Sequence, residues 1–352
     1  MKAPPNGPDH GLAAALPPTL PSGLHLPTVL PAGSGDPANR SEWGRVANLA
    51  NRIGAVLRKD SLRRPGLVQP QLLVFAADHG IADEGVSRFG QEATRQRVEA
   101  LVQGNTDVNR MARDAGVALT VVDAGISVPL TPAPATEAGA PLLSRKIAYG
   151  TRNMVLRSAM STEQTIAAMR AGMDVVRHLP GNAVLVAETG VANTSSAILM
   201  LSRLCGVPLA DACGHHPDLN DEMARHKLEK LFAAATRHRK AVRPFEVLVT
   251  MGGFELAMMA GAMIQAASEG RLVVVDGFVA GAAALVARGL VPAVSDYLVY
   301  SHLSVDPGHR LLMIHLQDRP LLDMELRLGQ GAGALLAWPL ILAAEQLGQT
   351  GT

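Results

Sequence analysis

Short apolar runs that stop at a polar or acidic residue recur along the chain. Residues 71–77 (QLLVFAA), residues 118–122, the run that ends at Glu188 and residues 271–275 all have this form. Fully buried strands of a parallel sheet produce such runs, because helices cover both faces of the sheet. We therefore predict strands in these segments. Residues 245–250 (FEVLVT) have the same composition and are predicted to form a further strand.

Segments in which apolar residues recur at helical spacing separate these runs. Folded structure is expected to begin at Ser41, where this spacing starts, and the helix after the first strand is expected to end near Gly104. Ser161 supplies a capping hydroxyl for a helix that runs to His178. The helix after residues 251–253 is rich in alanine and glycine, which lets helix backbones approach closely. Strands that alternate with helices predict an α/β fold, with a Rossmann-like parallel sheet and helices on both of its faces.

Composition and charge narrow the class of protein. The chain has 352 residues, with 32 Lys and Arg against 31 Asp and Glu, and no basic run is interleaved with aromatic residues, so nucleic acid is a poor candidate partner. No segment approaches the roughly 18 unbroken apolar residues of a membrane span, and the start of the sequence lacks the pattern of a secretory signal. Cys205 and Cys213 cannot build a disulfide framework and fit a reducing compartment. These features favour a cytoplasmic protein with no membrane partner.

Acidic residues follow the predicted strands at the end where parallel sheets bind ligands. Asp78 and Asp123 end the first two strands, and Glu188 and Asp276 end two later ones. The carboxyl ends of parallel strands meet at one edge of a sheet, and open α/β folds place their ligands in the crevice there. We therefore expect several carboxylates along this edge.

The stretch from Ala183 to Ala197 (AVLVAETGVANTSSA) contains the clearest candidate site. After Glu188 come a turn of small residues and the polar residues Asn193 and Thr194, which open a helix. Backbone N–H groups at a helix start have no intrahelical partner and attract anions. This order predicts a phosphate cradle with Glu188 at its edge. A strand-to-helix turn that binds no ligand explains the same residues equally well.

Other segments carry residues of chemical interest. The loop after Gly80 contains Phe89 and Gln91, which are varied enough to line a pocket. Residues 213–218 (CGHHPD) are rich in potential metal ligands, but no further Cys or His lies at a usual zinc spacing, so we predict a loop and no metal site. Lys227 lies in a helical pattern, where a lone lysine is normally solvated.

Six motifs occur in the order found in one enzyme family. They are AADHGIADEGVSRFGQEAT, ETGVANTSSA, MGGFELAMMAGAMIQAA, VVVDGFVAGAAAL, SHLSVDPGHR and LRLGQGAGALLAWPLILAA. Over roughly residues 41–346 the chain resembles the nicotinate mononucleotide:dimethylbenzimidazole phosphoribosyltransferases, which make the lower-ligand nucleotide of cobalamin. The resemblance implies a Rossmann-like large domain, a small helical domain built from both chain ends, and a homodimer with active sites near the subunit contact.

The chain is accordingly divided into three parts. Residues 1–40 are rich in Pro and Gly and are expected to form an extended arm or to be partly disordered. Residues 41–70 and 334–352 are assigned to the small helical domain. Residues 71–333 are assigned to the large α/β domain of the phosphoribosyltransferase type.

The resemblance also implies a reaction and roles for individual residues. In that family an aromatic nitrogen of the benzimidazole attacks the ribose C1 of nicotinate mononucleotide, nicotinate leaves, and no cofactor takes part. The phosphate must be held, the acceptor ring stacked, and its N–H proton removed. Matched by motif, the catalytic positions are Glu188 and Gln330, the phosphate and nucleotide contacts are Gly190, Asn193, Thr194, Lys227 and Ser304, and the acceptor pocket is lined by Asp78, His79, Phe89, Gln91 and Leu328.

The sequence departs from the family pattern at both ends of the expected site. The last glycine loop of the family reads Gly-Glu-Gly-Thr-Gly and its glutamate is the general base, whereas this chain has Gln330 within Gly-Gln-Gly-Ala-Gly. Glutamine does not take up a proton at neutral pH, and loss of a general base typically lowers a rate by about 100- to 10,000-fold. The early Lys-Pro-Pro-Gly-Ser-Leu-Gly-Arg element survives only as residues 43–45, and another glycine loop has become residues 213–217.

Three interpretations of Gln330 stay open. In the first, the chain is an active transferase in which Glu188, Asp78 or His79 supplies the base, or in which the acceptor differs from dimethylbenzimidazole. In the second, it is a non-catalytic family member that binds a nucleotide or base as a sensor or partner subunit. In the third, the glutamine is a deliberate replacement, which the altered residues 213–217 argue against. Outside the family, a dinucleotide-binding enzyme is the alternative, and no Gly-x-Gly-x-x-Gly follows the first strand to support it.

Overall fold

The computed structural model describes residues 41–57, 66–130, 138–217 and 219–349, together with Leu26 and Thr136. The arm expected over residues 1–40 lies, apart from Leu26, outside the described residues.

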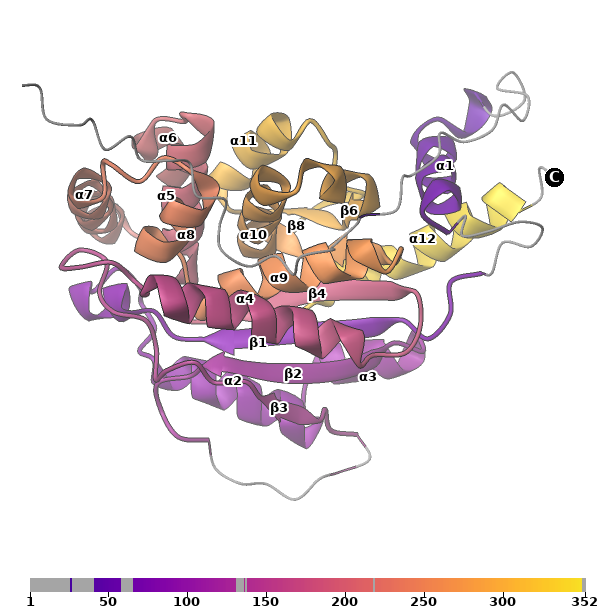
Figure 1. Ribbon diagram of the computed structural model, residues 1–352, viewed down its shortest axis with the longest axis horizontal. Coiled ribbons are helices and arrows are strands. Elements are labelled where there is room, and N and C mark those ends of the chain that lie inside the picture. The colour runs from indigo at the N-terminus through magenta and orange to yellow at the C-terminus, as the bar shows by residue number, and fades with distance from the viewer. Residues whose placement is uncertain are drawn as a thin grey trace, which may run out of the picture.

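A parallel six-stranded sheet forms the centre of the molecule (Figure 1), with strand order β3-β2-β1-β4-β5-β6. Each neighbouring pair runs parallel. This is the order of the doubly wound dinucleotide-binding fold, in which strands are added outward in both directions from the neighbouring first and fourth strands. The expected fold class is therefore confirmed. The strands are β1 (Gln71–Ala77), β2 (Ala118–Gly125), β3 (Leu142–Ser144), β4 (Ala183–Thr189), β5 (Leu272–Val275) and β6 (Leu298–Tyr300).

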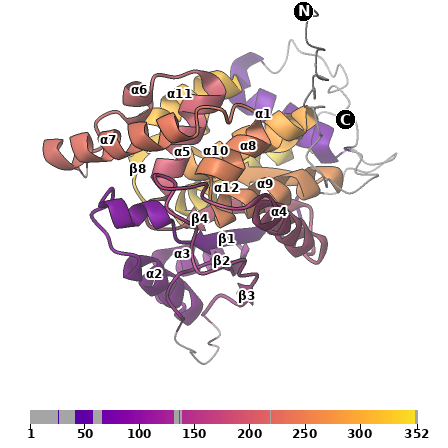
Figure 2. The same cartoon turned by 60° about the vertical axis from the view of Figure 1, so that its left-hand side comes forward.

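Helices cover both faces of the sheet. Helices α2 (Glu92–Gln103) and α3 (Asp107–Asp114) lie on one side, and α4 (Thr162–Arg177) and α9 (Phe254–Ser268) lie on the other (Figure 2). All residues of β1 and β5 are buried as a result, which explains why those strands read as continuous apolar runs. The predicted cap at Ser161 is present, with its hydroxyl accepting from the N–H of Gln164.

The remaining elements complete the fold. A second, two-stranded parallel sheet pairs β7 with β8. These elements are α5 (Asn193–Cys205), α6 (Leu209–Cys213), α7 (Asp221–Arg237), α8 (Pro244–Met251), α10 (Gly277–Leu290), β7 (His302–Ser304), α11 (Pro307–Leu316) and β8 (Leu322–Leu326), with short 3-10 helices at Ser41–Trp43, Gly80–Glu84 and Pro292–Tyr297.

Elements from the two ends of the described chain pack together. Helix α1 (Arg45–Leu57) lies against α12 (Ala332–Gln349), although almost the whole sequence separates them (Figure 1). Ile53 of α1 and Ile341 of α12 are both buried in the common core. This packing supports the proposal of a small helical domain from both chain ends, which stays a proposal.

The strand predicted over residues 245–250 is wrong, because this segment lies in α8. Pro244 occupies the first turn of the helix, where its missing N–H costs nothing. The Glu246 carboxylate accepts from the N–H groups of Val242 and Arg243 and so caps the helix start. Val247 and Leu248 are buried, so a short helix hides the same apolar residues that suggested a strand.

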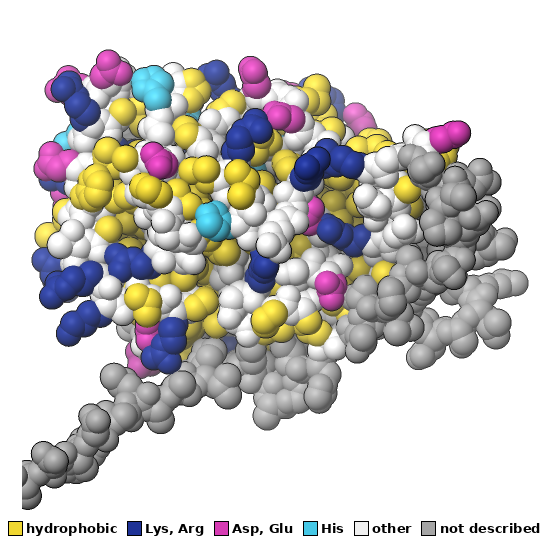
Figure 3. Space-filling view, turned by 90° about the horizontal axis from the view of Figure 1, so that it is seen from above, with side chains coloured by type: hydrophobic (Ala, Val, Ile, Leu, Met, Phe, Trp, Pro, Cys, Tyr) yellow, Lys and Arg dark blue, Asp and Glu magenta, His cyan; other side chains and the backbone are white. Residues whose placement is uncertain are grey.

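Charged side chains of both signs are spread over the face seen in Figure 3, and hydrophobic side chains are exposed between them. This mixture agrees with the near balance of 32 basic and 31 acidic residues.

Within the described part of the chain, no helix has the length and apolar character needed to cross a membrane.

Helices α4 and α9 approach at glycines. A Cβ atom at Gly172 of α4 would overlap the carbonyl oxygen of Met258, and one at Gly261 of α9 would overlap that of Met169. The close approach expected from the small residues of α9 is therefore present, and it lets α4 and α9 pack tightly against each other on one face of the sheet.

Gly172→Ala tests this helix contact. Alanine inside a helix is normally more stable than glycine by about 0.5–1 kcal/mol, whereas overpacking typically costs about 1–3 kcal/mol. We expect the clash to dominate and the free energy of unfolding to fall, as measured by chemical denaturation. Gly90→Ala is the control, because its new methyl group meets nothing within 4 Å. A Gly172→Ala protein at least as stable as the wild type would contradict the packing described here.

Candidate active site

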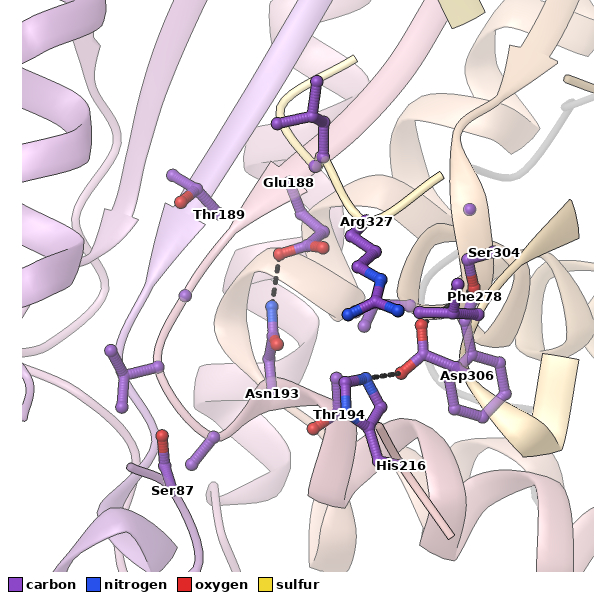
Figure 4. A pocket seen from close by; sticks show the side chains of 18 of the residues that line it. Ser87, Glu188, Thr189, Asn193, Thr194, His216, Phe278, Ser304, Asp306 and Arg327 are labelled. Atoms are coloured by element: carbon purple, nitrogen blue, oxygen red, sulfur yellow. Dashed lines mark hydrogen bonds and ion pairs between the residues drawn. The ribbon is translucent and has the colours of Figure 1, made fainter. Parts of the chain in front are cut away.

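A cavity of about 390 Å³ opens at the carboxyl ends of β4 and β5. Its wall is formed by the loop before α2, the β4–α5 turn, the start of α10, the loop after β7 and the loop between β8 and α12 (Figure 4). The cavity therefore lies at the sheet edge where ligands of doubly wound folds bind.

The β4–α5 turn presents backbone N–H groups to the cavity. A side chain at Gly190 would overlap the carbonyl oxygen of Ala77 at the end of β1, so the turn requires glycine there. Ala192, the residue before α5, has a left-handed φ of 67° and no side-chain cap for the helix. The first N–H groups of α5 thus lack a capping side chain, which is the arrangement of an anion site.

Cationic and hydroxyl groups surround this helix start. Lys227 of α7 is buried and donates to the Thr194 hydroxyl at 3.2 Å. Burial lowers the pKa of Lys227, while nearby Cys213 and Asp306 act in the opposite direction. The Ser304 hydroxyl donates to Asp306 at 2.8 Å, and His216 Nε2 lies 3.7 Å from the other oxygen of that carboxylate (Figure 4). Together these groups suit a bound phosphate.

Glu188 lies near the end of β4 and faces the cavity, where the Asn193 side-chain amide donates to its carboxylate (Figure 4). Burial raises the pKa of Glu188 to about 8, and the charges of Glu255 and Asp276 add to this rise. A carboxyl group that titrates so close to neutrality is able to exchange a proton with a ligand at physiological pH.

The glycine loop before α12 closes the cavity opposite the helix start. Asp276 accepts hydrogen bonds from the backbone N–H groups of Gly331 at 2.9 Å and Ala334 at 2.8 Å. The Gln330 N–H donates to the Glu188 carbonyl oxygen at 3.2 Å, and Gln330 has a left-handed φ of 66°. The loop is therefore attached to both β4 and β5.

Two exposed hydrophobic side chains line the same cavity. Phe89 is 42% exposed and Leu328 is 60% exposed. The guanidinium carbons of Arg88 and Arg97 lie 4.6 Å and 4.9 Å from the centre of the Phe89 ring. An aromatic ring, a leucine and guanidinium groups are side chains that suit a flat aromatic ligand, and we call the part of the cavity wall that they line the slot.

The cavity brings together most of the residues that the sequence singled out. Residues from five separate segments of the chain meet there. They are Phe89, Glu188, Gly190, Asn193, Thr194, Lys227, Ser304, Leu328 and Gln330.

Asp78, His79 and Gln91 do not line this cavity, which corrects the expectation that they do. Asp78 is buried and accepts from the Ser127 N–H and hydroxyl, both at 2.8 Å, and Gln91 Oε1 lies 3.0 Å from the same hydroxyl oxygen. His79 is also buried, with Nε2 2.6 Å from Glu255. These side chains turn toward the packed interior, so neither Asp78 nor His79 reaches a ligand in the cavity as a base.

Several residues of the cavity wall were not expected from the sequence. Asp306 lies two positions after Ser304, which ends a short strand. Side chains two positions apart in a strand point to the same side, so this spacing could have placed Asp306 in the site beside Ser304. Arg327 lies between Glu188 and Asp306 in Figure 4 and directly precedes Leu328. No pattern in the sequence marks Arg97 as a site residue, because only the packing of the folded chain shows which face of α2 lines the cavity.

Among the described residues, no group of three or more His, Cys, Asp or Glu side chains is arranged to hold a metal ion. Asp218 of the CGHHPD segment lies outside the described residues.

Comparisons with known proteins all match phosphoribosyltransferases. The sequence model of the DBI_PRT family, described as a phosphoribosyltransferase, matches residues 39–350. The chain is 45% identical over 304 residues to the nicotinate-nucleotide–dimethylbenzimidazole phosphoribosyltransferase of Cupriavidus necator, which covers 86% of this chain and 85% of that protein. It is 44% identical over 301 residues to the protein of the same name from Variovorax paradoxus, covering 86% and 84%.

The fold agrees with these relatives. A crystal structure of the nicotinate-nucleotide–dimethylbenzimidazole phosphoribosyltransferase from Thermus thermophilus matches with a TM-score of 0.80 and 34% sequence identity, covering 88% of this chain and 91% of that one. Sequence, sheet order and the phosphate-type cradle thus lead to the same conclusion. The chain belongs to the DBI_PRT family of phosphoribosyltransferases.

Proposed function

We propose that this chain transfers the phosphoribosyl group of nicotinate mononucleotide to a benzimidazole-type base. The products are an α-linked ribazole phosphate and nicotinate, in the assembly of the cobalamin nucleotide loop. The observation that carries this proposal is a single cavity whose wall includes both the start of α5, with Lys227 and Thr194, and the exposed side chains of Phe89 and Leu328. The names of the relatives support the same pair of substrates.

The phosphate is assigned to the start of α5. There Gly190 gives close access to the backbone, and the Thr194 hydroxyl, the Lys227 ammonium and the Ser304 hydroxyl surround the anion. Asn193 contributes indirectly, because its amide holds the Glu188 carboxylate. Charge-assisted hydrogen bonds of this kind are the strong ones in proteins.

Glu188 is assigned as the group that takes the acceptor N–H proton. It lies between the cradle and the slot, and its pKa of about 8 is close to the pH at which a base works best. Gln330 occupies the facing loop and is assigned a hydrogen bond to the acceptor ring, since an amide binds but does not remove a proton. The resemblance to the family further supports a cytoplasmic homodimer.

Glu188→Gln tests the base. Only ionised Glu188 accepts a proton, so kcat/KM of the wild type should rise about tenfold per pH unit below about pH 8 and then level off. The substitution should lower kcat/KM by about 100- to 10,000-fold and abolish that rise. The size of kcat/KM and its dependence on pH are both measured from the rate of nicotinate release. Glu92→Gln, at an exposed position outside the cavity, should behave as wild type. An unchanged pH profile in Glu188→Gln would refute the assignment.

Lys227→Met tests the phosphate end, because methionine fills the same buried space without the charge. We expect the affinity for nicotinate mononucleotide to fall by about 10- to 100-fold, as for a lost hydrogen bond to a charged group. Nicotinate riboside, which has no phosphate, should bind equally to both proteins in calorimetry. Equal losses for the nucleotide and the nucleoside would place the phosphate elsewhere.

Gln330→Glu separates an active enzyme from a binding protein. With a second carboxylate at the slot, turnover of 5,6-dimethylbenzimidazole should rise at least about tenfold over a measurable wild-type rate. A wild type that is inactive with every base, beside an active Gln330→Glu variant, would instead favour a family member that only binds the nucleotide or base.

A further inference from the structure

Arg97 is a cation that lines the cavity and forms no salt bridge with any acidic side chain that the structure describes. Its side chain is half-buried on α2, lines the cavity and lies over the Phe89 ring. Among the described residues no acidic side chain forms a salt bridge with it, whereas Arg95, on the same helix, is bound to Glu92 and Glu99. A half-buried guanidinium group that forms no salt bridge with a carboxylate is suited to an anionic ligand.

The charged groups around Arg97 add to this preference. Arg88 stacks on the same ring, and Arg327 comes from the loop between β8 and α12. The facing acid is Glu188, whose raised pKa leaves it largely protonated at neutral pH, and Gln330 is uncharged. The positive charge of Arg97 favours the ionised form of Glu188 and so opposes part of the rise in its pKa.

We propose that Arg97 holds the acceptor as an azolate anion and so selects ring bases that are more acidic than dimethylbenzimidazole. The inference rests on the proposed function and defines its acceptor class. It also explains why a glutamine stands at position 330. An acidic ring loses its N–H proton readily, so one weak base, Glu188, is enough to remove it.

The N–H proton of the azole moves to the Glu188 carboxylate, and the ring becomes an anion beside the Arg97 guanidinium. The lone pair of the other ring nitrogen forms a bond to ribose C1. The bond from C1 to the pyridinium nitrogen breaks with its electron pair, which leaves a neutral pyridine ring in the departing nicotinate. Glu188 then returns its proton to water.

Two rings of nearly equal size test the proposal. Chlorine and methyl groups have similar volumes, but 5,6-dichlorobenzimidazole is the stronger N–H acid of the pair with 5,6-dimethylbenzimidazole. The wild type should prefer the dichloro ring in kcat/KM. Arg97→Gln should lower kcat/KM for the dichloro ring by about 10- to 100-fold and for the dimethyl ring by less than about threefold. Arg97→Lys should keep part of the preference.

Arg95→Gln is the matched control, because it removes a positive charge from α2 outside the cavity and should leave the preference unchanged. A wild type that favours the dimethyl ring, or equal losses on both rings in Arg97→Gln, would overturn the proposal.

A binding measurement separates this inference from the proposed function. Azolates absorb at longer wavelength than neutral azoles, so the ultraviolet difference spectrum of the bound dichloro ring should show the anion in the wild type and the neutral ring in Arg97→Gln. If neither ring receives a phosphoribosyl group, the proposed function fails, and an anion spectrum still supports the role of Arg97. A ring that binds in its neutral form, or does not bind, overturns that role.

Discussion

A buried carboxylate at the end of β5 holds the last helix of the chain against the sheet. Asp276 accepts from the N–H groups of Gly331 and Ala334, which lie at the start of α12 and lack intrahelical partners. Burial raises the pKa of Asp276, while the adjacent His302 and these N–H groups favour its charged form. A side chain at Gly333 would overlap the His302 ring, so the helix start fits closely over this pair. The loop that carries Gln330 is fixed by this contact.

The glycine loop is attached to the sheet at a second point. The Gln330 N–H also binds the Glu188 carbonyl oxygen, so the slot and the helix start of α5 keep a defined separation. A transfer between two bound reactants gains most of its rate when they are held in line. The cavity wall offers backbone N–H groups and Lys227 to one reactant, and Phe89, Leu328 and arginines to the other. The chemistry of the donor and that of the acceptor are therefore set by different segments of the chain.

Residue order along the chain predicts the central strands and the main turn of the site, but not the direction of every side chain. Residues 71–77 are recognisable because burial on both faces removes polar positions, whereas residues 245–250 show that a short apolar run fits a buried helix as well. Strands of three residues are too short to form a pattern. The strand–glycine–helix order located Glu188, yet His79, also at a strand end, turns into the core toward Glu255. Arg97 lies on an ordinary polar helix, and only the folded chain shows what it faces.

The central claim is that a glycosyl phosphate and an aromatic ring occupy the two ends of one cavity. A crystal structure with nicotinate mononucleotide and a benzimidazole bound together tests it most directly. The account predicts the phosphate at the start of α5, within hydrogen-bond distance of Lys227 and Thr194, and the ring between Phe89 and Leu328 with one nitrogen facing Glu188. A phosphate bound away from Lys227, or a ring bound outside the cavity, would contradict it.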